Sequence, residues 1–288
     1  MLELKSVSKR FGSADYAVHE VSLKLGKGVV GLIGHNGAGK TTLMQMIATL
    51  MRPTQGEIVF QGVDILKFPD AMRSRLGYLP QDFGVYPNLS GMELMQYFAG
   101  LKGVRNPRRI SELLELVNLS EHAHRSAAAY SGGMRRRLGI AQALLNDPDI
   151  LVVDEPTAGL DPEERMRFRN LLADLGQEKL VLMSTHIVSD VESIANELAI
   201  MRKGCVIAHA TPEAMMESAY GKIWSALVSE AELQELKSRT QILHVQKQVD
   251  GYLVRIAHVA QPCLQARLQL PSLEDALMAQ RYAVQEDA

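Results

Sequence analysis

The chain has 288 residues, of which 47% are hydrophobic and 22% are charged, and its formal net charge is −2 at pH 7. This balance excludes a disordered chain, and the near-neutral charge does not indicate a broad basic surface, so we expect no nucleic-acid partner. The two cysteines, Cys205 and Cys263, lie in no CxxC or Cys/His cluster, which argues against a disulfide scaffold or a cysteine zinc site and favours a reducing compartment.

The apolar runs of the sequence are short. Residues 1–11 are mixed and charged, so we expect no signal peptide there. The richest runs, such as residues 29–33 and 150–153, span four or five residues, whereas a membrane-spanning helix needs about 20. No membrane-spanning helix is therefore expected.

The first part of the chain predicts strands over residues 2–7, 16–25 and 29–33. The run from Val29 to Ile33 is wholly apolar, which indicates a strand buried on both faces, as in a parallel sheet. A glycine-rich turn follows it, and residues 43–51 have helical composition. Residues 82–126 predict mostly helix, with Ser90 and Glu93 spaced as a capping box.

Apolar strands alternate with helices through the middle of the chain. Strands are predicted over residues 150–153 and 180–184. Asp161, followed by proline and two glutamates, predicts a helix N-terminus, and Thr211 before Pro212 predicts another. This alternation predicts an α/β fold with a mainly parallel sheet.

Glycine usage changes near residue 205. Of the 22 glycines, only Gly221 and Gly251 lie beyond Gly204. Alternating patterns over residues 242–249 and 252–256 then predict further strands. We therefore expect a main domain over residues 1–215 and a small α+β accessory domain over residues 216–288.

The segment from Gly34 to Thr42 contains the P-loop pattern Gly34-x4-Gly39-Lys40-Thr41. Glycines let backbone N–H groups converge on phosphate oxygens, and the following helix directs its positive end at the same anion. Lys40 supplies charge for the β- and γ-phosphates, and the Thr41 hydroxyl is a hard oxygen ligand for magnesium. A glycine turn that only packs is the alternative, which the flanking strand and helix disfavour.

An acidic pair follows the strand over residues 150–153. Asp154 stands where a carboxylate would hold magnesium through water, and Glu155 could polarise an attacking water as a general base. Taken alone, the pair is equally typical of a turn that caps a strand.

Three further features have ordinary interpretations when taken singly. Ser131-Gly132-Gly133-Met134 indicates a serine N-cap at the start of a helix. The Arg135–Arg137 run on that helix and the Arg108-Arg109 pair are each typical of a solvated face. His186 after an apolar strand is typical of a structural histidine, and Gln81 alone indicates nothing.

Taken in order, these motifs resemble the nucleotide-binding subunit of an ATP-binding cassette (ABC) transporter. The resemblance covers about residues 1–215. It implies a P-loop NTPase core with a mainly parallel sheet, an antiparallel β subdomain, a helical subdomain over about residues 83–135 and a small C-terminal α+β appendage.

The resemblance also implies a role for each motif. Glu155, His186 and Gln81 would be catalytic, as the general base, the switch histidine and the Q-loop glutamine. Mg²⁺ would be held by Thr41, Gln81 and Asp154. Phe11 would lie under the adenine ring, with Tyr16 a competing candidate and simple edge packing the alternative. The residues expected to bind ATP are Phe11, Gly34, Asn36, Gly37, Ala38, Gly39, Lys40, Thr41, Thr42, Ser131, Gly132, Gly133 and Asp161.

The resemblance implies an assembly as well. Two cassettes, expected as a homodimer, would enclose two ATP molecules head to tail, with Ser131–Gly133 of one facing the P-loop of the other. The helical region would dock on an integral membrane permease subunit, which places the chain peripherally on the cytoplasmic face of the plasma membrane.

Two features favour export. By resemblance, Ser131-Gly132-Gly133 is the family's signature motif. Tyr130 and Met134 stand on either side of it where Leu and Gln are commoner, in a form that resembles a subgroup of bacterial exporters. Residues 271–278 resemble the Pro-Ser-Leu-Glu-Asp helix near the end of many bacterial export-type cassettes. The alternative for this tail is a plain helix N-terminus capped by Ser272.

Two other function classes stay open. One is an ABC ATPase that works in translation or on DNA, which the single cassette and the lack of extended heptads disfavour. The other is a regulatory module that senses ATP without turnover, which an intact set of Asp154, Glu155 and His186 disfavours.

Overall fold

The computed structural model describes residues 1–12 and 15–286, with side chains described as far as residue 280. The chain divides into two compact units, Met1–His209 and Ala210–Ala288. This division precedes helix α7 (Pro212–Ser218), which Thr211 caps by accepting a hydrogen bond from the Ala214 backbone at 3.2 Å. The boundary predicted at 215/216 lies inside that helix, because the helix begins with its cap and not where the glycine usage changes.

A six-stranded sheet in the order β10-β9-β3-β8-β7-β6 forms the centre of the first unit. Its strands are β3 (Gly28–Ile33), β6 (Leu76–Leu79), β7 (Ile150–Asp154), β8 (Leu180–Thr185), β9 (Glu197–Arg202) and β10 (Cys205–Ala210). The pairs β3–β8, β3–β9, β7–β8 and β6–β7 are parallel. Every residue of β3, β7 and β8 is buried, which explains why these strands are continuous apolar runs rather than alternating ones.

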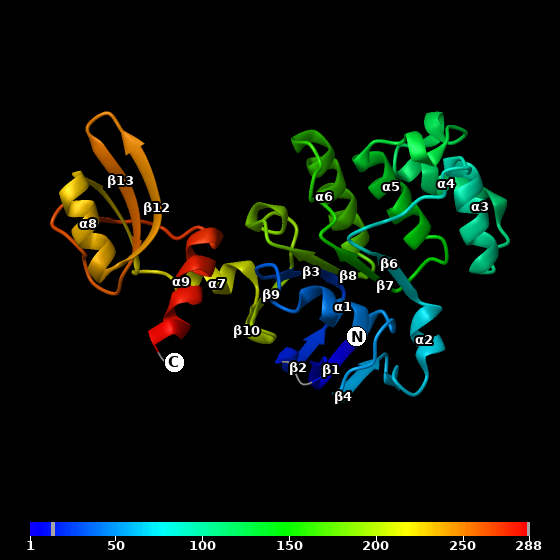
Figure 1. The fold of residues 1–288 in the computed structure, drawn as a ribbon, viewed down its shortest axis with the longest axis horizontal. Helices are drawn as coiled ribbons and strands as arrows, with labels where there is room; N and C mark the ends of the chain where they lie inside the picture. Colours follow the sequence, from blue (N-terminus) through cyan, green and yellow to red (C-terminus); the bar gives the residue numbers. More distant parts are fainter. Residues whose placement is uncertain (13–14, 287–288) are drawn as a thin grey trace. The chain divides into compact units, whose positions relative to one another are not determined.

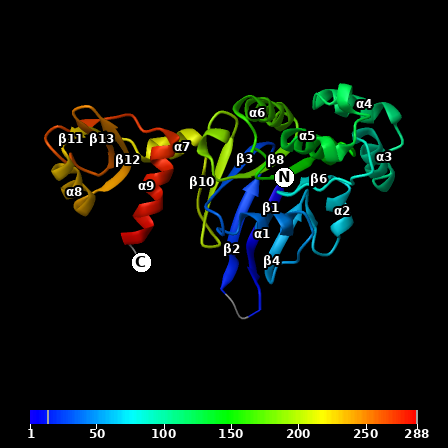
Figure 2. The ribbon, with the colours of Figure 1, turned by 45° about the horizontal axis from the view of Figure 1, so that its top comes forward.

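A second sheet of the first unit has the order β2-β1-β4-β5. It consists of β1 (Leu2–Arg10), β2 (Tyr16–Leu25), β4 (Gln55–Phe60) and β5 (Val63–Asp64), all paired antiparallel. Helix α1 (Lys40–Ile47) lies between this sheet and the central sheet, with α5 (Gly132–Ala143) and α6 (Pro162–Gly176) on the other face (Figures 1 and 2). The predicted antiparallel subdomain is thus confirmed.

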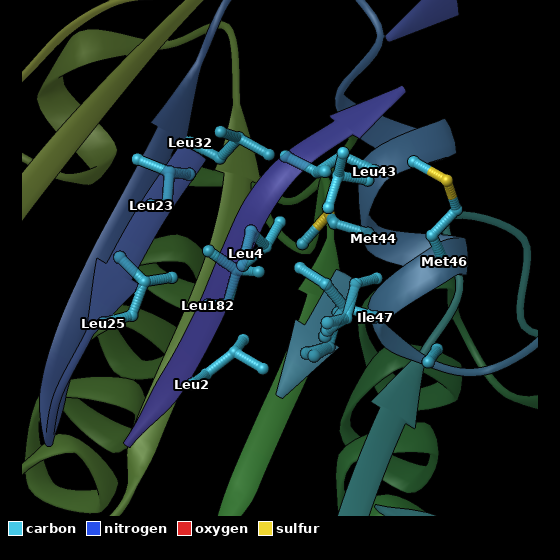
Figure 3. Close-up of a cluster of buried hydrophobic side chains, with 14 of the residues drawn as sticks. Leu2, Leu4, Leu23, Leu25, Leu32, Leu43, Met44, Met46, Ile47 and Leu182 are labelled. Carbon is cyan, nitrogen blue, oxygen red and sulfur yellow. The ribbon is translucent and has the colours of Figure 1, made fainter. Parts of the chain in front are cut away.

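The main core fills the space between the two sheets. Figure 3 shows leucines of β1 and β2 directed toward α1 and toward the central strands; the labelled side chains are Leu2, Leu4, Leu23, Leu25, Leu32, Leu43, Met44, Met46, Ile47 and Leu182. Helix α1 is shorter than the predicted helical stretch, which extended to residue 51. It ends at Ile47, and Thr49 has a φ of +59°, outside the helical region.

The helical segment contains α3 (Gly91–Leu101), α4 (Pro107–Leu116), the single turns Ser120–His122 and Ala127–Ala129, and α5, while α2 (Pro69–Arg73) precedes it. The predicted capping box is confirmed: Ser90 accepts from the Glu93 backbone at 3.3 Å, and Glu93 accepts from the Ser90 backbone at 2.8 Å. Residues 82–89 are irregular, so helix begins later than predicted.

Two cations fasten α3 and α4 to the C-terminal end of α5. Lys102, just after α3, donates to the backbone oxygen of Gln142 at 2.9 Å and to the side-chain oxygen of Asn146 at 3.1 Å. Arg109 of α4 donates to the backbone oxygen of Leu144 at 2.9 Å. These donors meet carbonyls that a helix end leaves unpaired. The interpretation of Arg108-Arg109 as a solvated face is therefore wrong for Arg109.

The second unit is a small α+β domain, as predicted. Its sheet has the order β12-β13-β11-β14, from β11 (Ile223–Val228), β12 (Gln241–Gln248), β13 (Gly251–Ala257) and β14 (Arg267–Leu268). Helix α8 (Glu230–Arg239) packs on one face through Leu233 and Leu236. Helix α9 (Leu273–Glu286) contributes Ala276 to a second cluster with Ile223 and Leu243. Within the described ranges, no helix is both long and apolar enough to span a membrane.

Candidate active site

The loop from Gly34 to Gly39 joins β3 directly to α1. Gly37 and Gly39 have φ values of +80° and +101°, a region that side chains disfavour. A Cβ on Gly39 would lie 2.3 Å from the Ala17 carbonyl oxygen, and one on Gly34 would lie 2.6 Å from that of Met201. Gly39 caps α1 without a side-chain hydrogen bond, so the first N–H groups of the helix point into the loop without a capping side chain. This is the geometry that receives an anion.

Lys40 lies at the centre of this loop and is 5% exposed. Its Nζ donates to the backbone oxygens of Gly34 at 2.7 Å and His35 at 3.1 Å, and lies 3.7 Å from Oε1 of Glu155. Burial lowers the pKa of Lys40, although the carboxylates of Glu155 and Asp154 oppose that shift. The ammonium group is thus a partly desolvated charge that is available to phosphate oxygens.

Asp154 ends β7 and is completely buried. Ser184, its register partner on β8, donates to Oδ1 of Asp154 and accepts a hydrogen bond from the Glu155 backbone at 2.8 Å. Ser184 therefore joins the Asp154 carboxylate to the Glu155 backbone. It was not predicted, and only its position at the end of the neighbouring parallel strand could have indicated it.

The other oxygen of Asp154, Oδ2, is buried without a hydrogen-bond partner. An unpaired buried carboxylate oxygen is costly, and together with the Thr41 hydroxyl it is the kind of hard oxygen donor that Mg²⁺ prefers. Among the residues that the structure describes, no cluster of three or more His, Cys, Asp or Glu side chains could hold a metal. The donor set fits Mg²⁺ only if phosphate and water supply the remaining ligands, as is usual for this ion.

Glu155 and His186 approach each other at the ends of β7 and β8. Nδ1 of His186 lies 3.4 Å from Oε1 of Glu155. Glu155 has a φ of +45°, a strained conformation for this residue type, and Arg136 of α5 donates to its backbone oxygen. Lys40, Glu155 and His186 thus meet at one edge of the sheet, with Asp154 joined through Ser184.

The Ser131–Gly133 segment begins α5. Ser131 accepts a hydrogen bond from the Met134 backbone at 3.1 Å, which confirms the predicted N-cap. Of the arginines that follow, Arg135 is exposed, as the solvated-face interpretation predicts. That interpretation is wrong for Arg136 and Arg137, which are half-buried and donate to the Glu155 backbone oxygen and to Glu164, the latter at 3.1 Å. A Cβ on Gly133 would lie 1.7 Å from the Glu164 carboxylate, so a side chain at this position would require that carboxylate to move.

The remaining predicted residues lie outside this contact network. Phe11 is 48% exposed, and Nζ of Lys9 lies 5.3 Å from its ring centroid. Tyr16 has the Arg10 guanidinium 5.5 Å from its ring centroid, so both aromatic candidates bear a neighbouring cation. Gln81 is exposed, and Asp161 caps α6 by accepting from the Glu164 backbone at 2.8 Å.

The other loop residues have mixed environments. Ala38 is buried, and its backbone oxygen accepts from the Gly204 backbone at 3.0 Å. Asn36 and Thr41 are exposed, and Thr42 is half-buried. The structure thus presents Asn36 and Thr41 on the open side of the loop and uses Ala38 to fasten it.

Comparison with known proteins agrees with this geometry. A model of the ABC transporter family matches residues 18–158. The ABC transporter ATP-binding protein NatA of Bacillus subtilis (strain 168) is 37% identical over 227 residues, covering 76% of this chain and 92% of that protein. The Nod factor export ATP-binding protein I of Cupriavidus pinatubonensis is 36% identical, covering 77% of this chain and 69% of that protein.

A solved structure is similar as well. The dimeric post-hydrolysis state of the ATP-binding cassette MJ0796, bound to ADP and Pi, has a TM-score of 0.67 and 26% identity, covering 73% of this chain and 98% of that one. The chain belongs to the ABC transporter family, as an ATP-binding and ATP-hydrolysing subunit.

Proposed function

We propose that this chain works as one half of a head-to-tail cassette dimer that hydrolyses ATP to drive export through a separate membrane subunit. The observation that carries the proposal is the contact set of Lys40, Glu155 and His186 beside the unpaired oxygen of Asp154. The Nod factor export relative supports export, and the dimeric ADP-bound cassette supports the assembly.

The P-loop would bind the triphosphate. Its N–H groups and the positive end of α1 would face the β- and γ-phosphates, and Lys40 would exchange its carbonyl partners for phosphate oxygens. Thr41, Asp154 and Gln81 are the residues that would hold Mg²⁺, which when bound neutralises charge on the phosphates. Phe11 would stack on the adenine ring.

Glu155 would act as the general base. Its carboxylate would take a proton from the water that attacks the γ-phosphorus, while the bond from that phosphorus to the leaving ADP oxygen breaks. Nζ of Lys40 lies 3.7 Å from Oε1 of Glu155. His186 would contact the γ-phosphate and orient the water. Gln81 would connect this centre to the helical segment.

The second cassette would complete the site. The Ser131–Gly133 segment of each chain would face the ATP of the other, adding the positive end of α5 and excluding water, and Asp161 would lie at the same interface. We propose a homodimer. Binding of ATP would close the dimer and hydrolysis would reopen it, moving the helical region over residues 83–135 against the membrane subunit.

The C-terminal tail supports the export assignment only modestly. Ser272 and Asp275 form a reciprocal cap, with the Asp275 backbone donating at 3.1 Å and the Ser272 backbone at 2.8 Å. This local role accounts for part of the motif. The proposed location, peripheral on the cytoplasmic face of the plasma membrane, follows from the membrane partner.

Substitution Glu155→Gln tests the catalytic assignment. The change removes the base but keeps the shape, so we expect hydrolysis by the full chain to fall by about 10²- to 10⁴-fold while ATP binding persists. The bound ATP should then hold the chain as a dimer in size-exclusion chromatography with light scattering. Glu163→Gln on the exposed start of α6 is the matched control and should leave turnover unchanged. Unchanged turnover in Glu155→Gln would contradict the role of Glu155.

A further inference from the structure

A buried side-chain hydrogen bond joins the two segments that carry Glu155 and His186. Thr157, two residues after Glu155, is 1% exposed, and Asp190, four residues after His186, is fully buried. The Thr157 hydroxyl donates to Oδ2 of Asp190 at 2.5 Å. The segment leaving β7 and the segment leaving β8 are therefore fastened just beyond the catalytic pair.

Helix α6 also contacts the segment that contains Ser189 and Asp190. Nε of Arg165 lies 3.8 Å from Oδ1 of Asp190, and Arg169 donates to the backbone oxygen of Ser189 at 2.6 Å. Oδ1 itself has no hydrogen-bond partner although it is buried. A buried carboxylate that is only partly paired costs free energy, so stability alone is a poor reason for an acid at this position.

Glu155 needs such a constraint. Its φ of +45° is strained, and strained residues persist only where their surroundings fix them. Ser184 fixes its backbone nitrogen and Arg136 its backbone oxygen. Thr157 is the next side chain along this segment with a buried hydrogen bond, and Asp190 connects that bond to the His186 side.

We infer that Asp190 is a positioning residue that, through Thr157, sets the separation of Glu155 and His186 and thereby the rate of ATP hydrolysis. The inference rests on the proposed roles of those two residues. A displacement of about 1 Å at a reacting centre can lower a rate by about 10²-fold, so this hydrogen bond is expected to act on kcat. The side-chain contacts described for Thr157 and Asp190 are with each other and with Arg165, not with the P-loop, so the KM for ATP should not change.

The test measures ATP hydrolysis by the full chain over a range of ATP concentrations, well below the unfolding temperature. Asp190→Ala and Thr157→Val should each lower kcat by about ten- to a hundredfold with KM unchanged within about twofold. Asp190→Asn keeps an acceptor for Thr157 and should recover most of kcat. The double variant Thr157→Val/Asp190→Ala should fall no further than either single one, because both remove the same bond.

A control separates positioning from loss of stability. Asp275→Ala removes a buried acid of the second unit that accepts from Arg255 at 2.7 and 2.6 Å, so it should lower the unfolding temperature without lowering kcat. Unchanged kcat in Thr157→Val, which keeps the volume of the side chain, would overturn the inference. So would an equal loss in Asp275→Ala, or additive losses in the double variant.

The failure of the proposed function has a different signature. Full activity in His186→Ala and Glu155→Gln would overturn the assigned roles whatever the Asp190 variants do. Low activity in those two variants together with full activity in Thr157→Val overturns only the positioning role of Asp190.

Discussion

Single residues of the site are constrained more by their own subunit than their motifs indicate. Gly133 belongs to the signature segment that would face ATP, yet a Cβ there would lie 1.7 Å from Glu164 of the same chain. Glu164 is held in place because it accepts a hydrogen bond from Arg137 at 3.1 Å. A side chain at position 133 would therefore displace this carboxylate from Arg137, whatever its role toward phosphate.

Substitution Gly133→Ala tests this contact. The added methyl group must displace Glu164, so we expect the free energy of unfolding to fall by about 1–3 kcal/mol. Gly133→Ala/Glu164→Ala should recover most of this loss, because the carboxylate is gone. Urea denaturation of the single and double variants measures it, with Gly132→Ala, whose Cβ would meet open space, as control. No recovery in the double variant would contradict the contact.

At the scale of elements, the C-terminal end of α5 holds a lysine side chain, Lys102, that is mostly buried. Lys102 caps the carbonyls of α5, and burial lowers the pKa of its ammonium group to about 8. In the unfolded chain the group titrates near its ordinary value of about 10.4. At neutral pH the buried, charged ammonium group therefore lowers the free energy of unfolding, and this penalty decreases at higher pH as the group loses its proton in the folded protein.

The sign of the pH dependence follows. Between about pH 8 and pH 10 the unfolded chain binds more protons at this position than the folded one, so the contribution of Lys102 to stability rises with pH. We expect the stability of the wild type, relative to Lys102→Met, to increase over this range. Urea midpoints at pH 7, 8, 9 and 10 give the comparison. Exposed Lys67, replaced by Met, should give no such rise, and a flat difference for Lys102→Met would contradict the lowered pKa.

At the scale of the whole molecule, the first unit contains all of the predicted ATP site and the second unit contributes a separate small core. The structure shows no membrane-spanning helix among the described residues. For the proposed membrane subunit, the helical segment offers the exposed Tyr97 and Leu101 on α3.

Purification of the tagged full chain from native membranes tests this assembly. We expect an integral membrane protein to copurify, because the proposed docking surface on α3 would bind it. Leu101→Asp should reduce the yield of that protein at least about tenfold, since a charge opposes burial of the surface. Leu227→Asp, at an exposed leucine of the second unit, is the matched control. Recovery of ribosomes or DNA in place of a membrane protein would contradict the transport proposal.

Much of the fold followed from local sequence because local interactions decide it. The caps at Ser90 and Asp161 depend on residues three positions away, and the P-loop geometry depends on glycines within one turn. Burial on both faces made β3, β7 and β8 readable as apolar runs. The early end of α1 was missed because composition alone does not fix the residue at which a helix ends.

The sequence by itself determined the family and the order of the motifs, and the resemblance implied that Lys40, Asp154, Glu155 and His186 act at one ATP site. Only the tertiary structure decided which atoms touch there: Ser184 between the Asp154 carboxylate and the Glu155 backbone, Arg136 on the Glu155 backbone and Asp190 on Thr157. The physical reason is that periodicity reports which faces are buried, whereas these contacts join residues 19 to 33 positions apart. Such contacts depend on how neighbouring strands and helices pack.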